Sequence, residues 1–103
     1  IDPDTWCLDP RAIEAAITPA TKGVIPVHLL GHPADMDTIN SVARAHGLWV
    51  VEDAAEATFS RYKGRPIGSL ATAATFSFFG NKIISCGEGG AVTCDDSDLA
   101  KRL

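Results

Sequence analysis

Polar residues with chemically useful side chains follow three apolar runs of the sequence. They are His28 after the first run, Glu52, Asp53 and Glu56 after the second, and Ser77, Asn81 and Lys82 after the third. In open α/β sheets, ligands bind beyond the carboxyl ends of the strands, where loop backbone and polar side chains converge. If the three runs are strands of one sheet, these residues are candidates for a common site.

A lysine, a carboxylate and a hydroxyl among these residues have the chemical types that an aldehyde cofactor such as pyridoxal phosphate (PLP) requires. Such a cofactor needs an amine that holds it covalently, an acid that keeps its ring nitrogen protonated, and donors for its phosphate. Lys82, Asp53 and Ser77 supply these three types. Residue types alone leave a structural interpretation open, because acids after a buried strand are often helix caps and most lysines are solvated.

Capping residues and apolar spacing predict two helices that would cover such a sheet. The pair Asp-Pro at residues 9–10 is typical of a helix start, and a Thr-Pro pair would end a short helix over about residues 10–17. A second helix is predicted to begin near Asp35 or Asp37 and to end before Gly47. Its apolar face consists of Met36, Ile39, Val42 and Ala43.

Continuous apolar runs predict the strands. GVIPVH at residues 23–28 is typical of a buried strand, although Pro26 would remove one hydrogen bond from the ladder. LWVV at residues 48–51 is followed by two carboxylates, as expected at the carboxyl end of a strand buried on both faces. ATAATFSFF predicts a third strand ending near Phe78, and GEGG marks a turn before a short strand AVTC. This order of elements predicts the α/β fold class with parallel strands.

Length and composition fit one small domain and argue against several classes of partner. The chain has 103 residues, of which 46% are apolar, and a net charge of -4 without a long Lys/Arg run. Binding to nucleic acids and to anionic membrane surfaces is favoured by clustered positive charge, so neither is expected as a partner. No apolar stretch approaches the roughly 20 residues of a membrane span, and the N-terminus lacks signal-peptide features, so a cytoplasmic protein is expected.

The three cysteines, Cys7, Cys86 and Cys94, are odd in number and widely spaced. None of them forms a CxxC pair, so they resemble neither a disulfide framework nor a zinc site. We expect reduced thiols and no bound metal.

Three stretches of the chain resemble consecutive motifs of the DegT/StrS-type sugar aminotransferases. The stretches are PVHLLGHPADMD, VEDAAEA and FSFFGNKIISCGEGG, in the order found in that family. The resemblance extends over nearly the whole chain. It implies a fold-type-I enzyme that uses PLP and acts on nucleotide-linked keto-sugars, with a mostly parallel sheet and flanking helices.

The resemblance and the chain ends together indicate part of a longer protein. The chain begins without Met and stops inside a predicted helix, DSDLAKRL. Residues 1–103 are then a fragment of the large PLP-binding domain, without the upstream cofactor-cradling segment or the C-terminal small domain of the family. The family's active sites lie at a dimer interface, which implies a homodimer for the full-length protein and an inactive fragment.

The resemblance also implies a role for each candidate residue. Lys82 corresponds to the lysine that holds PLP as a Schiff base and moves protons during the reaction. Ser77 corresponds to a phosphate contact, and Asp53 to the partner of the pyridinium nitrogen, whose protonation makes the ring an electron sink. Glu56 corresponds to a Gln/Glu position beside the phenolic oxygen of the ring, which requires a shared proton or a role short of direct contact.

The GNK form of the lysine motif, together with EDAAEA, resembles enzymes that make GDP-perosamine from GDP-4-keto-6-deoxymannose with glutamate as amino donor. Two alternatives remain open. One is a PLP-dependent sugar 3-dehydratase, although those relatives have histidine where this chain has Lys82. The other is a truncated remnant of the family without catalytic activity.

The chain departs from the family pattern at two places. Phe59 stands where a small residue, commonly glycine, is usual, and Ala71-Thr72 replaces a frequent Gly-Asp. A bulky residue at the first place costs about 1 kcal/mol or more if the backbone needs a positive φ. Neither change affects the four residues with implied roles.

Other conspicuous residues have simpler structural interpretations than a site. His28 and His32 are expected to be hydrogen-bonding residues of loops or helix entries. Gly87, Gly89 and Gly90 are expected to form a turn that needs positive φ. Phe76, Phe78 and Phe79 are expected to lie in the core.

Overall fold

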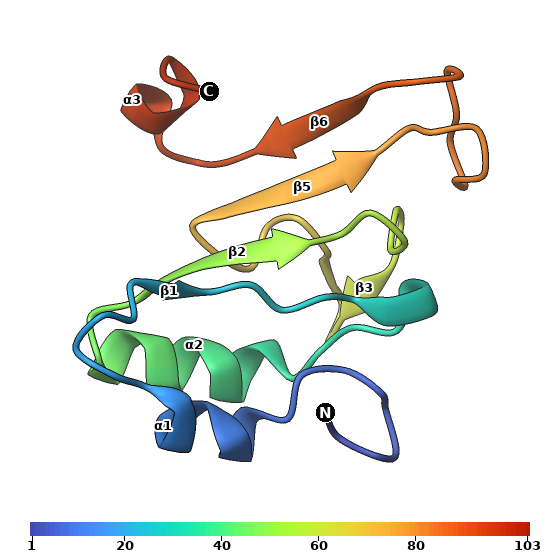
Figure 1. The fold of residues 1–103 in the computed structure, drawn as a ribbon. Helices are drawn as coiled ribbons and strands as arrows, with labels where there is room; N and C mark the ends of the chain where they lie inside the picture. The colour runs from blue at the N-terminus through green and yellow to red at the C-terminus, as the bar shows by residue number, and fades with distance from the viewer.

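The computed structural model describes all 103 residues and consists of one main sheet with the helices of the N-terminal half packed on one of its faces (Figure 1). The sheet has four strands in the order β1-β2-β5-β6. Their bounds are β1 Gly23–Val24, β2 Trp49–Asp53, β5 Ala73–Ser77 and β6 Gly90–Thr93. β1 pairs with β2, and β2 with β5, in parallel, whereas β6 runs antiparallel to β5. The predicted α/β class with a mostly parallel sheet is confirmed. The prediction of parallel strands is wrong for β6, because no crossover helix separates it from β5.

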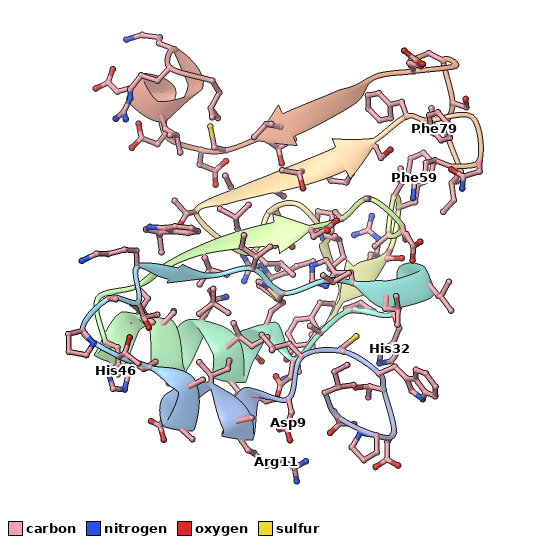
Figure 2. All side chains as sticks on the ribbon, viewed as in Figure 1. Asp9, Arg11, His32, His46, Phe59 and Phe79 are labelled. Carbon is pink, nitrogen blue, oxygen red and sulfur yellow. The ribbon has the colours of Figure 1, made fainter.

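The predicted N-terminal helix forms in two short pieces. A 3-10 turn, η1 (Pro10–Ala12), is followed by α1 (Ile13–Ala16). The carboxylate of Asp9 accepts the N–H of Arg11 at 3.0 Å and so caps the start, and both side chains are labelled in Figure 2. The predicted cap is confirmed, and the predicted end at residue 17 is one residue too long.

Helix α2 (Met36–Ala45) forms where the sequence predicts it. It begins after Asp35, whose side chain accepts the N–H of Thr38, and Gly47 follows its end with a φ of +64°. Its buried residues are Met36, Ile39 and Ala43.

The first predicted strand, over residues 23–28, is shorter than expected. Ladder pairing covers Gly23–Val24 and then resumes only as a single bridge between Val27 and Asp53. Pro26 interrupts the strand because it has no N–H to donate to β2, although its carbonyl accepts the N–H of Asp53 at 2.9 Å. The prediction of a buried strand is also wrong, since alternate residues of the run are exposed.

Strand β2 alternates between a buried face and an open face. Val50 and Glu52 are buried, whereas Trp49 is 45% exposed and Val51 is partly exposed. Because α1 and α2 cover only one side of the sheet in Figure 1, the prediction of a strand buried on both faces is wrong for this chain.

A small hairpin that the sequence analysis did not predict lies between β2 and β5. It consists of β3 (Arg61–Tyr62) and β4 (Arg65–Pro66), and its turn residues Lys63 and Gly64 have φ of +49° and +83°. Two successive positive φ values are typical of a tight hairpin turn. The hydroxyl of Tyr62 donates to Asp35 at 2.7 Å, which ties the hairpin to the start of α2.

Two further short helical segments complete the fold. They are η2 (Leu29–Gly31) and α3 (Ser97–Ala100). The helix predicted in DSDLAKRL is confirmed, but it ends at Ala100, so the prediction that the chain stops inside it is wrong. None of the helices has the length and apolar character needed to span a membrane.

The predicted core role of the three phenylalanines is only partly correct. Phe76 packs against the core and Phe78 is partly buried. Phe79 is 55% exposed, because it lies beyond the end of β5 at the sheet edge (Figure 2). The prediction is therefore wrong for Phe79.

Gly68, in the loop between β4 and β5, lies where a side chain does not fit. Its φ is +92°, and a Cβ added to it would lie 2.5 Å from Cζ of Phe76. Gly64 has a similar φ of +83°, but nothing lies within 4 Å of its Cβ position. A side chain at Gly64 would meet backbone strain alone, whereas a side chain at Gly68 would meet both strain and steric crowding.

Replacing these glycines tests the crowding directly. Gly68→Ala is expected to lower the free energy of unfolding by about 2 to 4 kcal/mol, because strain and overpacking add. Gly64→Ala, the matched control, is expected to cost about 1 kcal/mol from strain alone. Denaturant unfolding of the protein that carries this chain measures both losses, and equal losses would contradict the crowding argument.

Candidate active site at the carboxyl ends of the strands

Glu56 and Lys82 are brought together from different segments of the chain. Oε1 of Glu56 lies 3.8 Å from Nζ of Lys82, and the lysine side chain is 20% exposed. The pocket around them has a volume of about 270 Å³ and is also lined by Leu30, Ala55, Asn81 and Ile83. An amine that lies beside a carboxylate in such a pocket has the chemistry to react with an aldehyde and to exchange protons.

The loop after β5 carries Lys82. The N–H of Lys82 donates to the carbonyl of Phe79 at 3.0 Å, which closes a turn shortly after the strand. Phe78 closes the base of the loop, because its N–H donates to Gly89 and its carbonyl accepts the N–H of Cys86. Lys82 thus lies just past the carboxyl end of β5, as predicted.

Glu56 lies in the turn that follows β2 and is fixed by η2. Its Oε2 accepts the N–H of Leu30 at 3.0 Å. Leu30 has a left-handed backbone with a φ of +52°, which is uncommon for a residue with a branched side chain. One oxygen of Glu56 is therefore used by η2, and the other faces Lys82.

Asp53 is the last residue of β2. It pairs in register with Thr75, so by alternation Asp53, Thr75 and Ser77 direct their side chains to the same face of the sheet. Oδ1 of Asp53 accepts the N–H of Ala55 at 3.1 Å. One oxygen of Asp53 therefore caps the next turn, which is the structural role expected of an acid after a strand. Its second oxygen remains for a ligand.

Ser77 is the last residue of β5. Its Oγ accepts the N–H of Phe79 at 3.4 Å, a long hydrogen bond. The hydroxyl proton of Ser77 remains free to donate to a ligand.

The four candidate residues thus form two pairs. Glu56 and Lys82 line one pocket, whereas Asp53 and Ser77 share one face of the sheet and do not line that pocket. All four lie at or just past the carboxyl ends of β2 and β5. That they converge on one cofactor stays a prediction.

A buried pair next to these residues, His28 and Glu52, was not predicted as a pair. Both side chains are 0% exposed, and Nε2 of His28 lies 3.1 Å from Oε2 of Glu52. The predicted hydrogen-bonding role of His28 is confirmed, but nothing in the sequence linked it to Glu52. The available signal was a carboxylate directly after an apolar run, since a carboxylate that is buried there needs partners.

Glu52 also accepts two backbone hydrogen bonds, from Gly68 at 3.0 Å and from Leu70 at 2.8 Å. Burial alone would raise the pKa of this carboxyl. The hydrogen bonds from His28, Gly68 and Leu70 outweigh burial and hold the pKa below its ordinary value of 4.5. Glu52 is therefore ionised at neutral pH.

The simpler interpretations of the other conspicuous residues are confirmed only in part. His32 is exposed at the end of η2, and its backbone carbonyl accepts a weak hydrogen bond from Sγ of Cys7 at 3.4 Å. Its position in a loop is confirmed, whereas a hydrogen bond of its side chain stays a prediction. Gly87 and Gly89 have φ of +88° and +135°, as expected for a turn built on glycine. The prediction is wrong for Gly90, which has no positive φ and is the first residue of β6. All three cysteines are free thiols.

Phe59 occupies a position that favours glycine. The N–H of Ser60 donates to the carbonyl of Ala57 at 3.0 Å, which makes Phe59 the third residue of a tight turn. Its φ is +70° and its side chain is 78% exposed, near the carboxyl-end edge of the sheet (Figure 2). The condition for backbone strain at Phe59 is therefore met.

Relief of this strain is measurable. Phe59→Gly is expected to raise the free energy of unfolding by about 1 kcal/mol, because little packing is lost and the left-handed backbone is relaxed. Thr58→Gly is the control in the same turn. It is expected to destabilise, since its φ is not positive and glycine adds only chain entropy. Thermal or denaturant unfolding compares the two, and a less stable Phe59→Gly protein would contradict the strain.

Comparison with known proteins agrees with this arrangement. A mostly parallel α/β sheet, with a lysine and carboxylates beyond its strand ends, suits the cofactor-binding part of an aminotransferase. The chain belongs to the DegT/DnrJ/EryC1/StrS aminotransferase family, which matches residues 1–103. The predicted resemblance is thereby confirmed, and PLP is the cofactor of this family's aminotransferases.

Two curated relatives cover the chain almost completely. It is 57% identical over 102 residues to the GDP-perosamine synthase of Caulobacter vibrioides, covering 99% of this chain and 28% of that protein. It is 50% identical over 103 residues to the spore coat polysaccharide biosynthesis protein SpsC of Bacillus subtilis, covering 100% of this chain and 26% of that protein. The chain thus spans about a quarter of the length of these relatives.

Solved structures share the fold. The structure of DesI with its TDP-sugar product matches with a TM-score of 0.96 and 50% identity, over 99% of this chain and 26% of that chain. The structure of NtdA from Bacillus subtilis with bound cofactor PMP matches with a TM-score of 0.90 and 41% identity, over 99% of this chain and 23% of that chain.

Proposed function

We propose that this chain is the cofactor-binding part of an enzyme that transfers an amino group to a nucleotide-linked keto-sugar with PLP. The observation that carries the proposal is the Lys82 amine 3.8 Å from the Glu56 carboxylate in a chain of this family. Relatives support the substrate class, because one is named GDP-perosamine synthase and another has a structure with a TDP-sugar product.

The side chains at the strand ends fit PLP chemically. Lys82 would hold the cofactor covalently, Asp53 would pair with the ring nitrogen, and Ser77 would donate to the phosphate. Asp53 has an unused carboxylate oxygen and Ser77 an unused hydroxyl proton for this purpose, and the Lys82 amine contacts only Glu56, at 3.8 Å. When bound, PLP supplies an electron sink for the carbanion formed as a proton leaves the amino-bearing carbon.

The protein's own contribution is to hold these groups and to move a proton. Lys82 as a free amine would accept and return the substrate's proton at its Nζ. Glu56 keeps that amine oriented, because the N–H of Leu30 fixes one of its oxygens. A contact between Glu56 and the phenolic oxygen of the cofactor requires a proton shared between the two oxygens.

The finer assignment is conversion of GDP-4-keto-6-deoxymannose to GDP-perosamine with glutamate as amino donor. The identity of 57% to GDP-perosamine synthase supports it. In this proposal residues 1–103 are part of the large PLP-binding domain of a longer cytoplasmic protein. Its active site is completed in a homodimer, by an upstream cofactor-cradling segment and a C-terminal small domain.

Residues of this chain bear on the two alternative functions, a sugar 3-dehydratase and a non-catalytic remnant. Lys82 argues against the sugar 3-dehydratase, because a lysine at this place retains the cofactor that a dehydratase must release. The strained Phe59 favours a non-catalytic remnant, and the intact set of Asp53, Ser77 and Lys82 opposes it.

Reduction with borohydride tests the role of Lys82. In the complete protein, PLP is expected to give a visible absorbance band that disappears on reduction, with the cofactor then attached to the peptide containing Lys82. Lys82→Ala is expected to retain only weak, non-covalent cofactor, whereas Lys101→Ala, at an exposed lysine, behaves like the parent. Attachment to another lysine, or none while PLP is bound, would refute the assignment.

Asp53→Asn tests whether Asp53 sustains the electron sink. The variant keeps the size and one hydrogen bond but removes the charge, so PLP is expected to bind while turnover falls about 10²-fold, or about 3 kcal/mol of barrier. Single-turnover mixing with glutamate follows conversion of the cofactor to its amine form. Asp98→Asn, at an exposed carboxylate, is the control. Conversion as fast as in the parent would leave Asp53 as a turn cap only.

A further inference from the structure

The buried Glu52 carboxylate lies beside the candidate site but has no part in the chemistry proposed above. It is fully buried and accepts hydrogen bonds from the side chain of His28 and from the backbone of Gly68 and Leu70. A buried ion pair or charged network is weak support for stability, because apolar residues of the same volume often serve as well. We therefore ask which residues the buried Glu52 carboxylate holds in position.

His28 closes the loop that contains η2. The N–H of Ala34 donates to Nδ1 of His28 at 3.1 Å, so Nδ1 carries no proton and Nε2–H is the donor to Glu52. The backbone N–H of His28 also donates to the carbonyl of Asp53 at 3.0 Å. One imidazole thus joins both ends of the segment 28–34, and Glu52 holds that imidazole in place.

The middle of this closed segment contacts the candidate site. Leu30 donates its N–H to Glu56 at 3.0 Å, and Glu56 faces Lys82 at 3.8 Å. The left-handed backbone of Leu30, with a φ of +52°, requires support from its surroundings. Ser60 gives further support, since its hydroxyl donates to the carbonyl of Gly31 at 2.8 Å.

We infer that Glu52 and His28 are positioning residues that act through η2 on Glu56 and so orient Lys82 for the cofactor. This inference rests on the proposed function. Glu52→Leu keeps a similar volume but removes both acceptor oxygens, so Nε2–H of His28 loses its partner. His28 then loses its fixed orientation, and the Leu30 N–H no longer holds Glu56.

A double-mutant cycle on the PLP dissociation constant of the complete protein tests this path. Glu52→Leu is expected to weaken PLP binding about tenfold in the parent and less than about threefold in a Glu56→Ala background, because the effect passes through Glu56. Equal weakening in both backgrounds would overturn the inference. A parent that binds no PLP would refute the proposed function itself, and the inference with it.

A second pair of variants keeps the test valid if Glu52→Leu does not fold. His28→Gln retains one donor and one acceptor and is expected to keep PLP binding within about threefold of the parent. His28→Leu retains neither and is expected to weaken binding about tenfold, in the parent but not with Glu56→Ala. Equal PLP binding by the two variants would overturn the inference.

Ile39→Ala controls for general destabilisation. Ile39 is fully buried in α2 and leaves a cavity when truncated, but it makes none of the hydrogen bonds described here. At a temperature where all variants are folded, as judged by circular dichroism, it is expected to bind PLP like the parent. A tenfold loss with Ile39→Ala would show that loss of stability alone explains the effect and would overturn the inference.

Discussion

The rest of the arrangement depends on a single buried carboxylate. Glu52 is ionised and fully buried, so each donor around it must stay in place or leave the charge uncompensated. The donors come from two separate places: His28 after β1, and Gly68 and Leu70 in the loop before β5. One side chain of β2 therefore fixes the segments on both sides of it in the sheet, where apolar packing alone would allow several positions.

Because side chains alternate along β2, the neighbouring acids Glu52 and Asp53 face opposite sides of the sheet and have different roles. Glu52 points to the covered face and is satisfied there by the protein, whereas Asp53 points to the open face and keeps one oxygen unused. Val50 and Val51 show the same division one step earlier, one buried and one partly exposed. A pair of consecutive carboxylates at a strand end thus serves both the structure and the candidate site, because successive residues face opposite ways.

Sequence reasoning succeeded where the signal is local and failed where it depends on distant partners. Helix α2 was predicted well because Asp35 and Gly47 mark its ends directly. The first strand was predicted too long, since the effect of Pro26 depends on its missing N–H facing β2. The hairpin was missed because residue type does not reveal a positive φ at Lys63. The partners of Glu52 lie far away in sequence, and the site residues were recognised through motifs of a family rather than through spacing.

The antiparallel pairing of β6 has a consequence for which contacts hold the candidate site together. β5 and β6 are joined by the loop that carries Lys82, so this part forms from contacts that are close in sequence. Asp53 and Glu56 join it only through the parallel pairing of β2 with β5, which closes a longer segment at a higher entropic cost. Closing the Lys82 loop therefore needs only the pairing of β5 with β6, whereas bringing Glu56 to Lys82 also needs the pairing of β2 with β5.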